Sequence, residues 1–578
     1  MKKLSCILFC LTFALVLFVG NTASGENAPQ VANKIEEPLQ IKVTPWGRTQ
    51  TEVDAAKLRV EESGVVQNAL KDTKYRLISF DTIGSEDKTR PAQMPTRFQI
   101  VFYDYTNDRT IVAGGDFAGK EEIVVGEADF EPGVSSEELQ AAFDLIKNTT
   151  ELGVLYSNNE IKTFGAMPPT SYVNGERLVN VGITFLKTGE NRVVGVSFKN
   201  NKIVEYKRSA PLYSKASAES CGITAANQGT TSSGTPGQYQ LTVSQSGATL
   251  WEMLVVRPSA SSGNAEERSG IEIRDVKYKG KSVLKRGHAP ILNVQYDSDF
   301  CGPYRDFQYA ESFFNAPEEG STEPAPGIRI LAAGQVAQTA VDSGVDRGNF
   351  RGIAVYTQNV GFGAEVVLVS EMEAGWYRYI MEWRFAPDGT IRPRYGFSAT
   401  NSSCVCATHR HHVYWRFDFD VVSPTNKILQ VERGRKFLQP VTNEAARLRN
   451  YATNRSYLIQ NSNSDEGYLL VPNISDGTSD AFSVGDFWFL KYHAETDGEP
   501  MEIDDPNSNT GDPKLDVPAN FTPWLNNESL VNQDVVVWYG AHYIHSHDGE
   551  NLLSPDRSGS NMISGEHVVG PNLRPVRW

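Results

Sequence analysis

The spacing of apolar and polar residues predicts β-strands through most of this chain. Residues 97–103 alternate in part, and the apolar run 110–113 follows after an Asn-Asp turn. Short runs of this kind, bounded by turn residues, are typical of strands. The pattern recurs from residue 241 to the end with little helical spacing. Within that part only residues 443–450 look helical, and we predict a helix there.

A different pattern predicts a helix soon after residue 135. Ser135 and Glu138 have the spacing of a capping box, in which each side chain bonds to the other residue's backbone N–H. Apolar residues then recur at i, i+3, i+4 and i+7, which places them on one helical face. These residues are Leu139, Ala142, Phe143 and Ile146.

Together the patterns predict a mainly β protein. We expect a large antiparallel β-sandwich over residues 241–578, because so long a run of strands buries its apolar faces by packing two sheets together. Two small α+β domains precede the sandwich, at residues 36–130 and 131–210. Residues 211–240 are rich in Ser, Gly and Thr and are predicted to be a linker.

The N-terminus has the pattern of a secretory signal peptide. Lys2 and Lys3 precede an apolar run over residues 4–19, and small residues follow at 23–25. The run is close to the length of a membrane anchor, but the polar residues directly after it favour cleavage. We therefore assign residues 1–25 to a signal peptide and expect a secreted or periplasmic protein with no membrane contact after cleavage.

Composition narrows the choice of partner. The chain has 578 residues, 40% of them hydrophobic, and a net charge of −15. This charge argues against nucleic acid, which favours a basic face.

Four cysteines remain beyond the signal peptide, and they are Cys221, Cys301, Cys404 and Cys406. An exported chain with four cysteines allows two disulfides in three possible pairings. Cys404 and Cys406 lie just before a histidine-rich strand, so zinc is the alternative. Their one-residue spacing differs from that of zinc fingers, which favours disulfides.

The first candidate chemistry lies on two predicted strands. Alternate residues of a strand face the same side, so Tyr377 and Tyr379 share a face over residues 377–385, where core tyrosines are the ordinary interpretation. His409 and His411 share a face on a later strand. A histidine pair at this spacing can chelate one ion, and imidazole suits copper, zinc or iron.

The opposite face of the histidine strand carries a second set of polar residues, namely His412, Arg416, Asp418 and Asp420. Two aspartates so close together are usually a solvated face, but their oxygens also suit calcium.

A third metal ligand is available near the C-terminus. The buried strand predicted over 534–538 leads into His542, His545 and His547. With His409 and His411 these are five of the nine histidines in the chain. This concentration favours a metal site.

These residues resemble the copper amine oxidases, over about 370–420 and 530–578. The family's Asn-Tyr-Asp/Glu-Tyr strand and Asp-Gly-Thr-Ile turn are similar to residues 376–379 and 388–391. Its His-x-His strand, with Arg and Asp-x-Asp downstream, is similar to residues 409–420. Its C-terminal Asp-x-Val-Val-Trp run, with a histidine eleven residues after the Asp, is similar to residues 534–545, and residues 573–575 resemble the family's ending.

The resemblance implies specific roles. Tyr377 is the expected precursor of topaquinone, and His409, His411 and His545 are the expected copper ligands, with His542 as the rival for the third place. The family's peripheral calcium site is expected at Asp418, Asp420, Asp534 and the Val535 carbonyl. The family's Tyr-Leu-Asp run, which supplies a gate tyrosine and the catalytic base, is matched by Tyr309, Ala310 and Glu311, with Asp306 as the alternative base.

The implied activity is oxidation of a small primary amine by dioxygen, giving an aldehyde, ammonia and hydrogen peroxide in a homodimeric enzyme. Two positions depart from the family pattern. Trp376 replaces its Asn beside the quinone, and Arg378 replaces its acidic residue. A catalytically inactive metal-binding protein is therefore the alternative function. A zinc hydrolase ranks last, because the chain lacks a His-Glu helix motif placed near these histidines.

Overall fold

The structure is a computed structural model. The residues that it describes are 37–84, 93–188, 190–206, 222–225, 231, 234–261, 268–296, 304–360, 363–400, 402–406, 409–433, 437–474, 476–477, 479, 485–493, 521–545 and 569–578. The predicted signal peptide lies outside these ranges. No helix among the described residues is both long enough and apolar enough to cross a bilayer.

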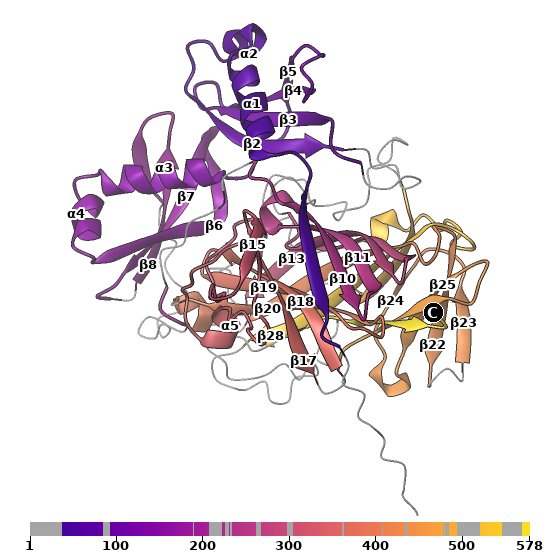
Figure 1. The fold of residues 1–578 in the computed structure, drawn as a ribbon. Coiled ribbons are helices and arrows are strands. Elements are labelled where there is room, and N and C mark those ends of the chain that lie inside the picture. The colour runs from indigo at the N-terminus through magenta and orange to yellow at the C-terminus, as the bar shows by residue number, and fades with distance from the viewer. Residues whose placement is uncertain are drawn as a thin grey trace, which may run out of the picture. The chain divides into compact units, whose positions relative to one another are not determined.

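The first α+β unit combines helices with one antiparallel sheet (Figure 1). Helix α1 begins with a capping box between Thr49 and Glu52 and buries Val53, Ala56 and Val60. Phe98 on the sheet belongs to the same apolar core. The elements are α1 Gln50–Glu61, α2 Gly64–Ala69, β2 Tyr75–Ile83, β3 Arg97–Asp104, β4 Arg109–Asp116 and β5 Val124–Ala128.

The second α+β unit contains the helix predicted after residue 135. The Ser135 side chain accepts a hydrogen bond from the Glu138 backbone N–H at 2.9 Å, which is one half of the predicted capping box; the Glu138 side chain bonds to Tyr105 and Arg177 instead of the Ser135 backbone. Glu138 itself is buried and forms an ion pair with Arg177. The elements are α3 Ser136–Lys147, α4 Leu152–Ser157, β6 Ile161–Val173, β7 Glu176–Phe185, β8 Glu190–Ser197 and β9 Lys202–Glu205.

Two larger sheets make up the predicted sandwich. The first sheet has the order β1-β10-β11-β12-β13-β21-β28-β27-β24, with β14 also paired to β13. Its strands are β1 Gln40–Trp46, β10 Gln238–Gln245, β11 Ala248–Val256, β12 Glu272–Tyr278, β13 Lys281–Tyr296, β14 Tyr304–Arg305, β21 His409–Phe419, β24 Ala445–Arg447, β27 Phe487–Lys491 and β28 Val535–His545.

The second sheet has the order β15-β16-β17-β18-β19-β20-β29-β26-β25-β22-β23. Its strands are β15 Thr322–Ala325, β16 Ile328–Ile330, β17 Ile353–Val360, β18 Gly363–Ala374, β19 Tyr377–Phe385, β20 Ile391–Ala399, β22 Asn426–Glu432, β23 Phe437–Val441, β25 Ser456–Asn461, β26 Gly467–Val471 and β29 Asn572–Val576. Short helices connect strands at α5 Ala340–Ser343, η1 Pro258–Ala260, η2 Ser403–Cys406, η3 Tyr451–Thr453 and η5 Thr522–Trp524.

The core lies between these two sheets. Trp383 of β19 and Phe417 of β21 have ring centroids 6.4 Å apart, and the Trp383 indole N–H donates to the Ile271 carbonyl at 3.0 Å. Trp251 of β11 packs on Phe385 of β19 at 5.2 Å. Aromatic side chains from facing strands therefore meet across the interior, and the predicted mainly β fold, a large antiparallel sandwich with two small α+β units, is confirmed.

Three details differ from the predictions. Residues 40–46, assigned to the first small domain, form β1 of the large sheet, where Trp46 pairs with Gln238. The predicted helix over 443–450 is wrong, because strand β24 lies there and pairs with β27. A helix of that length is marginal by itself, and tertiary pairing overrides it. Strand β16 runs parallel to β17, whereas the other strand pairs of this sheet are antiparallel.

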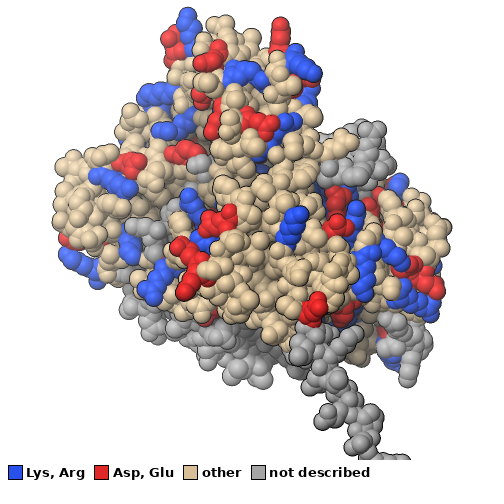
Figure 2. Space-filling model, viewed as in Figure 1, with Lys and Arg blue, Asp and Glu red and all other residues tan. Residues whose placement is uncertain are grey.

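Acidic and basic side chains are interspersed over the face drawn in Figure 2. On that face the net negative charge is therefore not gathered into a single acidic patch.

Candidate functional site

The Tyr377 ring lies against the predicted histidine pair. Tyr377 is the first residue of β19, which is held between β18 and β20 in the second sheet. Its ring centroid is 4.8 Å from that of His411 and 5.8 Å from that of His409, both on β21 of the first sheet. The side chain is 2% exposed. The structure therefore brings the tyrosine together with the two histidines that alternation placed on one face of their strand.

His409 and His411 have the arrangement of a chelating pair. Both are fully buried, and their ring centroids lie 5.0 Å apart. Phe397 stacks on His411 at 4.1 Å with 25° between the ring planes, which holds the imidazole plane in place. Buried imidazoles close together and beside a tyrosine are a donor set suited to a transition metal such as copper.

Strand register distinguishes the two candidates for the third ligand. His545 lies directly opposite His409 in the pairing of β21 with β28, whereas His542 lies opposite His412. The Nδ1 atoms of His412 and His542 are 2.9 Å apart, and His542 Nε2 is 3.1 Å from an Asp486 carboxylate oxygen. His542 thus packs with His412 on the face away from Tyr377. His547 lies outside the described residues.

A chain of polar contacts not expected from the sequence reaches His411. The Tyr379 hydroxyl donates to the Asp306 carboxylate, and the same hydroxyl oxygen lies 3.3 Å from His411 Nδ1. Asp306 is 2% exposed. Burial raises the pKa of its carboxyl and the Tyr379 hydrogen bond lowers it, and the net result is a pKa of about 7. Sequence spacing indicated only that Tyr379 shares a face with Tyr377.

Glu311 occupies a different environment. Its carboxylate forms a buried ion pair with Arg257 and also accepts hydrogen bonds from the Thr231 hydroxyl at 2.8 Å and the Ser259 backbone N–H at 3.2 Å. Burial opposes ionisation, but the Arg257 charge and these hydrogen bonds together hold the pKa of Glu311 below its usual value. Such a carboxylate is a weak proton acceptor.

The side chain of Tyr309, the expected gate tyrosine, is fixed by a hydrogen bond of its hydroxyl and by ring stacking. It donates to the Val134 carbonyl at 2.8 Å, and its ring stacks on Phe307 with centroids 5.0 Å apart. The Tyr309 hydroxyl and the Glu311 carboxylate therefore bond to Val134 and Arg257, whereas Asp306 is linked through Tyr379 to His411 beside the Tyr377 ring.

The two departures from the family pattern lie in different environments, since Trp376 is in the turn before β19 and Arg378 is on the strand itself. The Trp376 ring lies 6.2 Å from the Tyr377 ring and narrows the space beside it. Arg378 bonds both oxygens of Asp346, at 2.8 and 2.9 Å. The positive charge of Arg378, at a position where the family has an acidic residue, is therefore balanced by the Asp346 carboxylate.

The predicted calcium ligands converge at the far end of the histidine strand. One carboxylate oxygen from each of Asp418, Asp420 and Asp534 lies within 4.8 Å of the others. Val535, whose carbonyl was the fourth expected ligand, begins β28 beside them and pairs with Phe419. Oxygen donors converging in this way suit a hard cation such as calcium.

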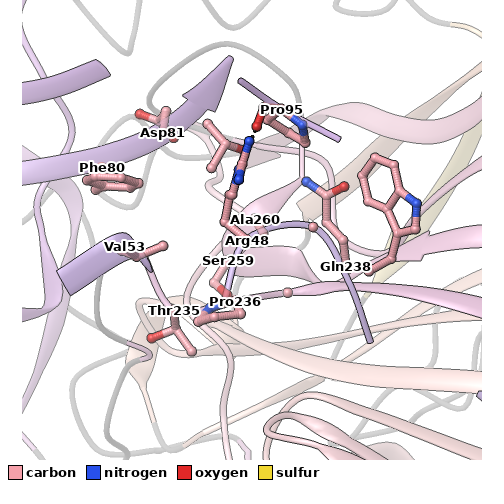
Figure 3. Close-up of a pocket in the computed structure, with 15 residues that line it drawn as sticks. Arg48, Val53, Phe80, Asp81, Pro95, Thr235, Pro236, Gln238, Ser259 and Ala260 are labelled. Atoms are coloured by element: carbon pink, nitrogen blue, oxygen red, sulfur yellow. Dashed lines mark hydrogen bonds between the residues drawn. The ribbon is translucent and has the colours of Figure 1, made fainter. Parts of the chain in front are cut away.

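A pocket of about 60 Å³ lies apart from these residues. Its lining includes Arg48, Phe80, Asp81 and Gln238, and Arg48 Nε donates to the Pro95 carbonyl at 2.7 Å (Figure 3). Its lining contains none of the predicted site residues, and its volume suits a few water molecules. It therefore gives no support to a substrate site.

Cys404 is buried and disulfide-bonded. Cys221 and Cys301 lie outside the described residues, so the pairing stays a prediction.

The fold is that of the copper amine oxidases. It is similar to a copper-containing benzylamine oxidase from Hansenula polymorpha, with a TM-score of 0.57 and 13% identity over 92% of this chain and 98% of that one. It is also similar to an amine oxidase from Aspergillus nidulans, with a TM-score of 0.51 and 13% identity over 93% and 90% of the two chains. No protein-family model and no curated protein sequence matches this chain.

Proposed function

We propose that this protein oxidises primary amines to aldehydes with dioxygen, using copper and a quinone made from Tyr377. The observation that carries the proposal is the packing of the Tyr377 ring against His409 and His411 across the two sheets. A cofactor precursor must lie beside its metal, and this arrangement supplies that proximity. The reaction consumes one amine, one dioxygen and one water, and it yields an aldehyde, ammonia and hydrogen peroxide.

His409, His411 and His545 would hold the copper. The donor set fits, because two buried imidazoles face Tyr377 and the third position lies opposite His409 in the strand register. Copper with dioxygen and the quinone would supply the redox chemistry and the electrophilic carbonyl that side chains lack.

Asp306 is the carboxylate that we assign as the base for the α-proton of the amine. Its pKa of about 7 lets it accept a proton near neutral pH and release it again. Glu311, the first choice from the sequence, is engaged by Arg257. Trp376 and Phe397 lie close to the Tyr377 ring and limit the space there, which favours a small amine.

The three clustered aspartates and the Val535 carbonyl are proposed as a calcium site that stabilises the sandwich. Export of the chain and a homodimeric assembly remain predictions.

A second candidate function is a catalytically inactive metal-binding protein. The observation in its favour is the Trp376 ring at 6.2 Å from Tyr377, where the family pattern has a smaller Asn.

Phenylhydrazine separates the two candidates. The purified apoprotein is loaded with copper in air and then treated with the reagent. A coloured adduct that is lost in Tyr377→Phe supports the oxidase. A colourless protein that still binds copper excludes the oxidase and favours the inactive protein. A protein that binds zinc alone and hydrolyses substrates contradicts both.

A further inference from the structure

The Tyr379 hydroxyl connects a carboxylate to a predicted copper ligand. It contacts Asp306 on one side and His411 Nδ1 on the other, the latter at 3.3 Å. All three side chains are at most 2% exposed, so bulk water does not compete for these contacts. The three residues come from three separate segments, so these contacts form only when the sheets pack together.

The direction of these hydrogen bonds follows from the donors available. A tyrosine hydroxyl carries one hydrogen, and Tyr379 donates it to Asp306. The hydroxyl oxygen therefore accepts from His411, so Nδ1 of that ring carries the proton. A neutral imidazole with its proton on Nδ1 has its lone pair on Nε2. Nε2 is then the atom of His411 left to bind a metal.

We propose that Tyr379 is a positioning residue that fixes the tautomer and ring orientation of His411, with Asp306 orienting its hydroxyl. The inference rests on the proposed copper site. The stacked Phe397 ring holds the plane of the imidazole but does not distinguish its two nitrogens. The hydroxyl does distinguish them, because it offers an acceptor to one nitrogen alone.

The test compares two buried tyrosines that each lose only a hydroxyl. Tyr379→Phe keeps the ring and removes the contact with His411. Tyr395→Phe is the matched control, since Tyr395 is also fully buried, its ring lies 5.8 Å from that of Tyr379, and its hydroxyl donates to Gln308 at 2.9 Å. Thermal unfolding of the metal-free proteins checks that both variants are folded.

The expected result is a copper(II) affinity lowered about 10- to 100-fold in Tyr379→Phe, the usual effect of losing such a partner. Its copper EPR spectrum also changes, whereas Tyr395→Phe keeps the wild-type values. Equal affinity and equal spectra in the two variants overturn the inference.

A second measurement needs no metal and no variant at Tyr379. Nitrogen-15 NMR of the histidine rings in the apoprotein, with His411 assigned by His411→Gln, reports its tautomer. A proton on Nδ1 supports the inference, and a proton on Nε2 overturns it.

The outcomes also separate this inference from the proposed activity. A wild-type protein that binds copper but gives no phenylhydrazine adduct excludes the oxidase, while the affinity comparison still decides the role of Tyr379. A wild-type protein that binds no copper overturns the metal site and the positioning role together.

Discussion

Replacing Arg378 should reduce stability without changing the chemistry at Tyr377. Arg378 and Asp346 are 1% and 3% exposed, and two hydrogen bonds of 2.8 and 2.9 Å join them. Arg378→Met leaves the buried Asp346 carboxylate without the guanidinium that balances its charge. Breaking a buried pair in this way costs about 3–5 kcal/mol. Loss of the 3.0 Å bond from Arg378 to the Tyr377 carbonyl adds about 1 kcal/mol.

The assay is thermal unfolding in parallel with copper binding and phenylhydrazine titration. We expect the unfolding temperature to fall by several degrees, with copper binding and adduct yield unchanged in protein that remains folded. The double variant Arg378→Met with Asp346→Leu removes this pair and should regain part of the lost stability, because apolar side chains can replace a buried ion pair, while Glu373, 3.7 Å from Arg378 in the wild type, keeps its charge. A lost adduct at unchanged stability refutes the reasoning, since it would place Arg378 in the chemistry of the site.

Three further predictions concern charge, metal and space. Burial raises the pKa of Glu371 to about 7 from the ordinary 4.5, so its stabilising contribution is complete below about pH 4.5 and is lost as pH rises to 7. Glu371→Gln should reduce this loss of stability at high pH by up to about 3 kcal/mol. Thermal unfolding of the wild type and the variant at pH 5 and pH 8 measures the loss, and an equal loss in both proteins contradicts the prediction. Calcium at 100 times its Kd should stabilise the wild type by about 2.7 kcal/mol and the Asp534→Asn variant much less. Thermal unfolding with calcium or with EDTA measures this, and equal shifts of the unfolding temperature in the two proteins argue against the site. Trp376→Asn should widen the space beside Tyr377 and speed quinone formation severalfold, measured by phenylhydrazine after timed exposure to copper in air, and an unchanged rate shows that Trp376 is not a constraint.

Local patterns predicted much of the fold. The capping residues Ser135 and Glu138 and the apolar spacing after them were sufficient for α3, because a helix is specified by neighbours in sequence. Alternation was sufficient to put His409 and His411 on one face and Asp418 on the other. The helix predicted over 443–450 failed, because pairing with the distant β27 decided its conformation.

The parts of the site that sequence did not reveal depend on distant partners. Glu311 was preferred as base by its place in a motif, but Arg257, 54 residues earlier in the chain, forms an ion pair with it. Asp306 and Tyr379 are 73 residues apart and meet only after the sheets pack. The pairing of β21 with β28 sets His545 opposite His409 and His542 opposite His412, a register that a count along one strand does not provide.

The pairing of β1 with β10 makes the two α+β units an insertion into the sandwich rather than a preceding segment. The chain leaves the large sheet after Trp46 and re-enters beside it at Gln238. A protease that cuts between these two positions therefore leaves β1 held only by noncovalent contacts, namely its pairing with β10 and the burial of Val43 in the sandwich core. During synthesis β1 is made before its pairing partner β10. This edge of the sheet can therefore form only after both inserted units have left the ribosome.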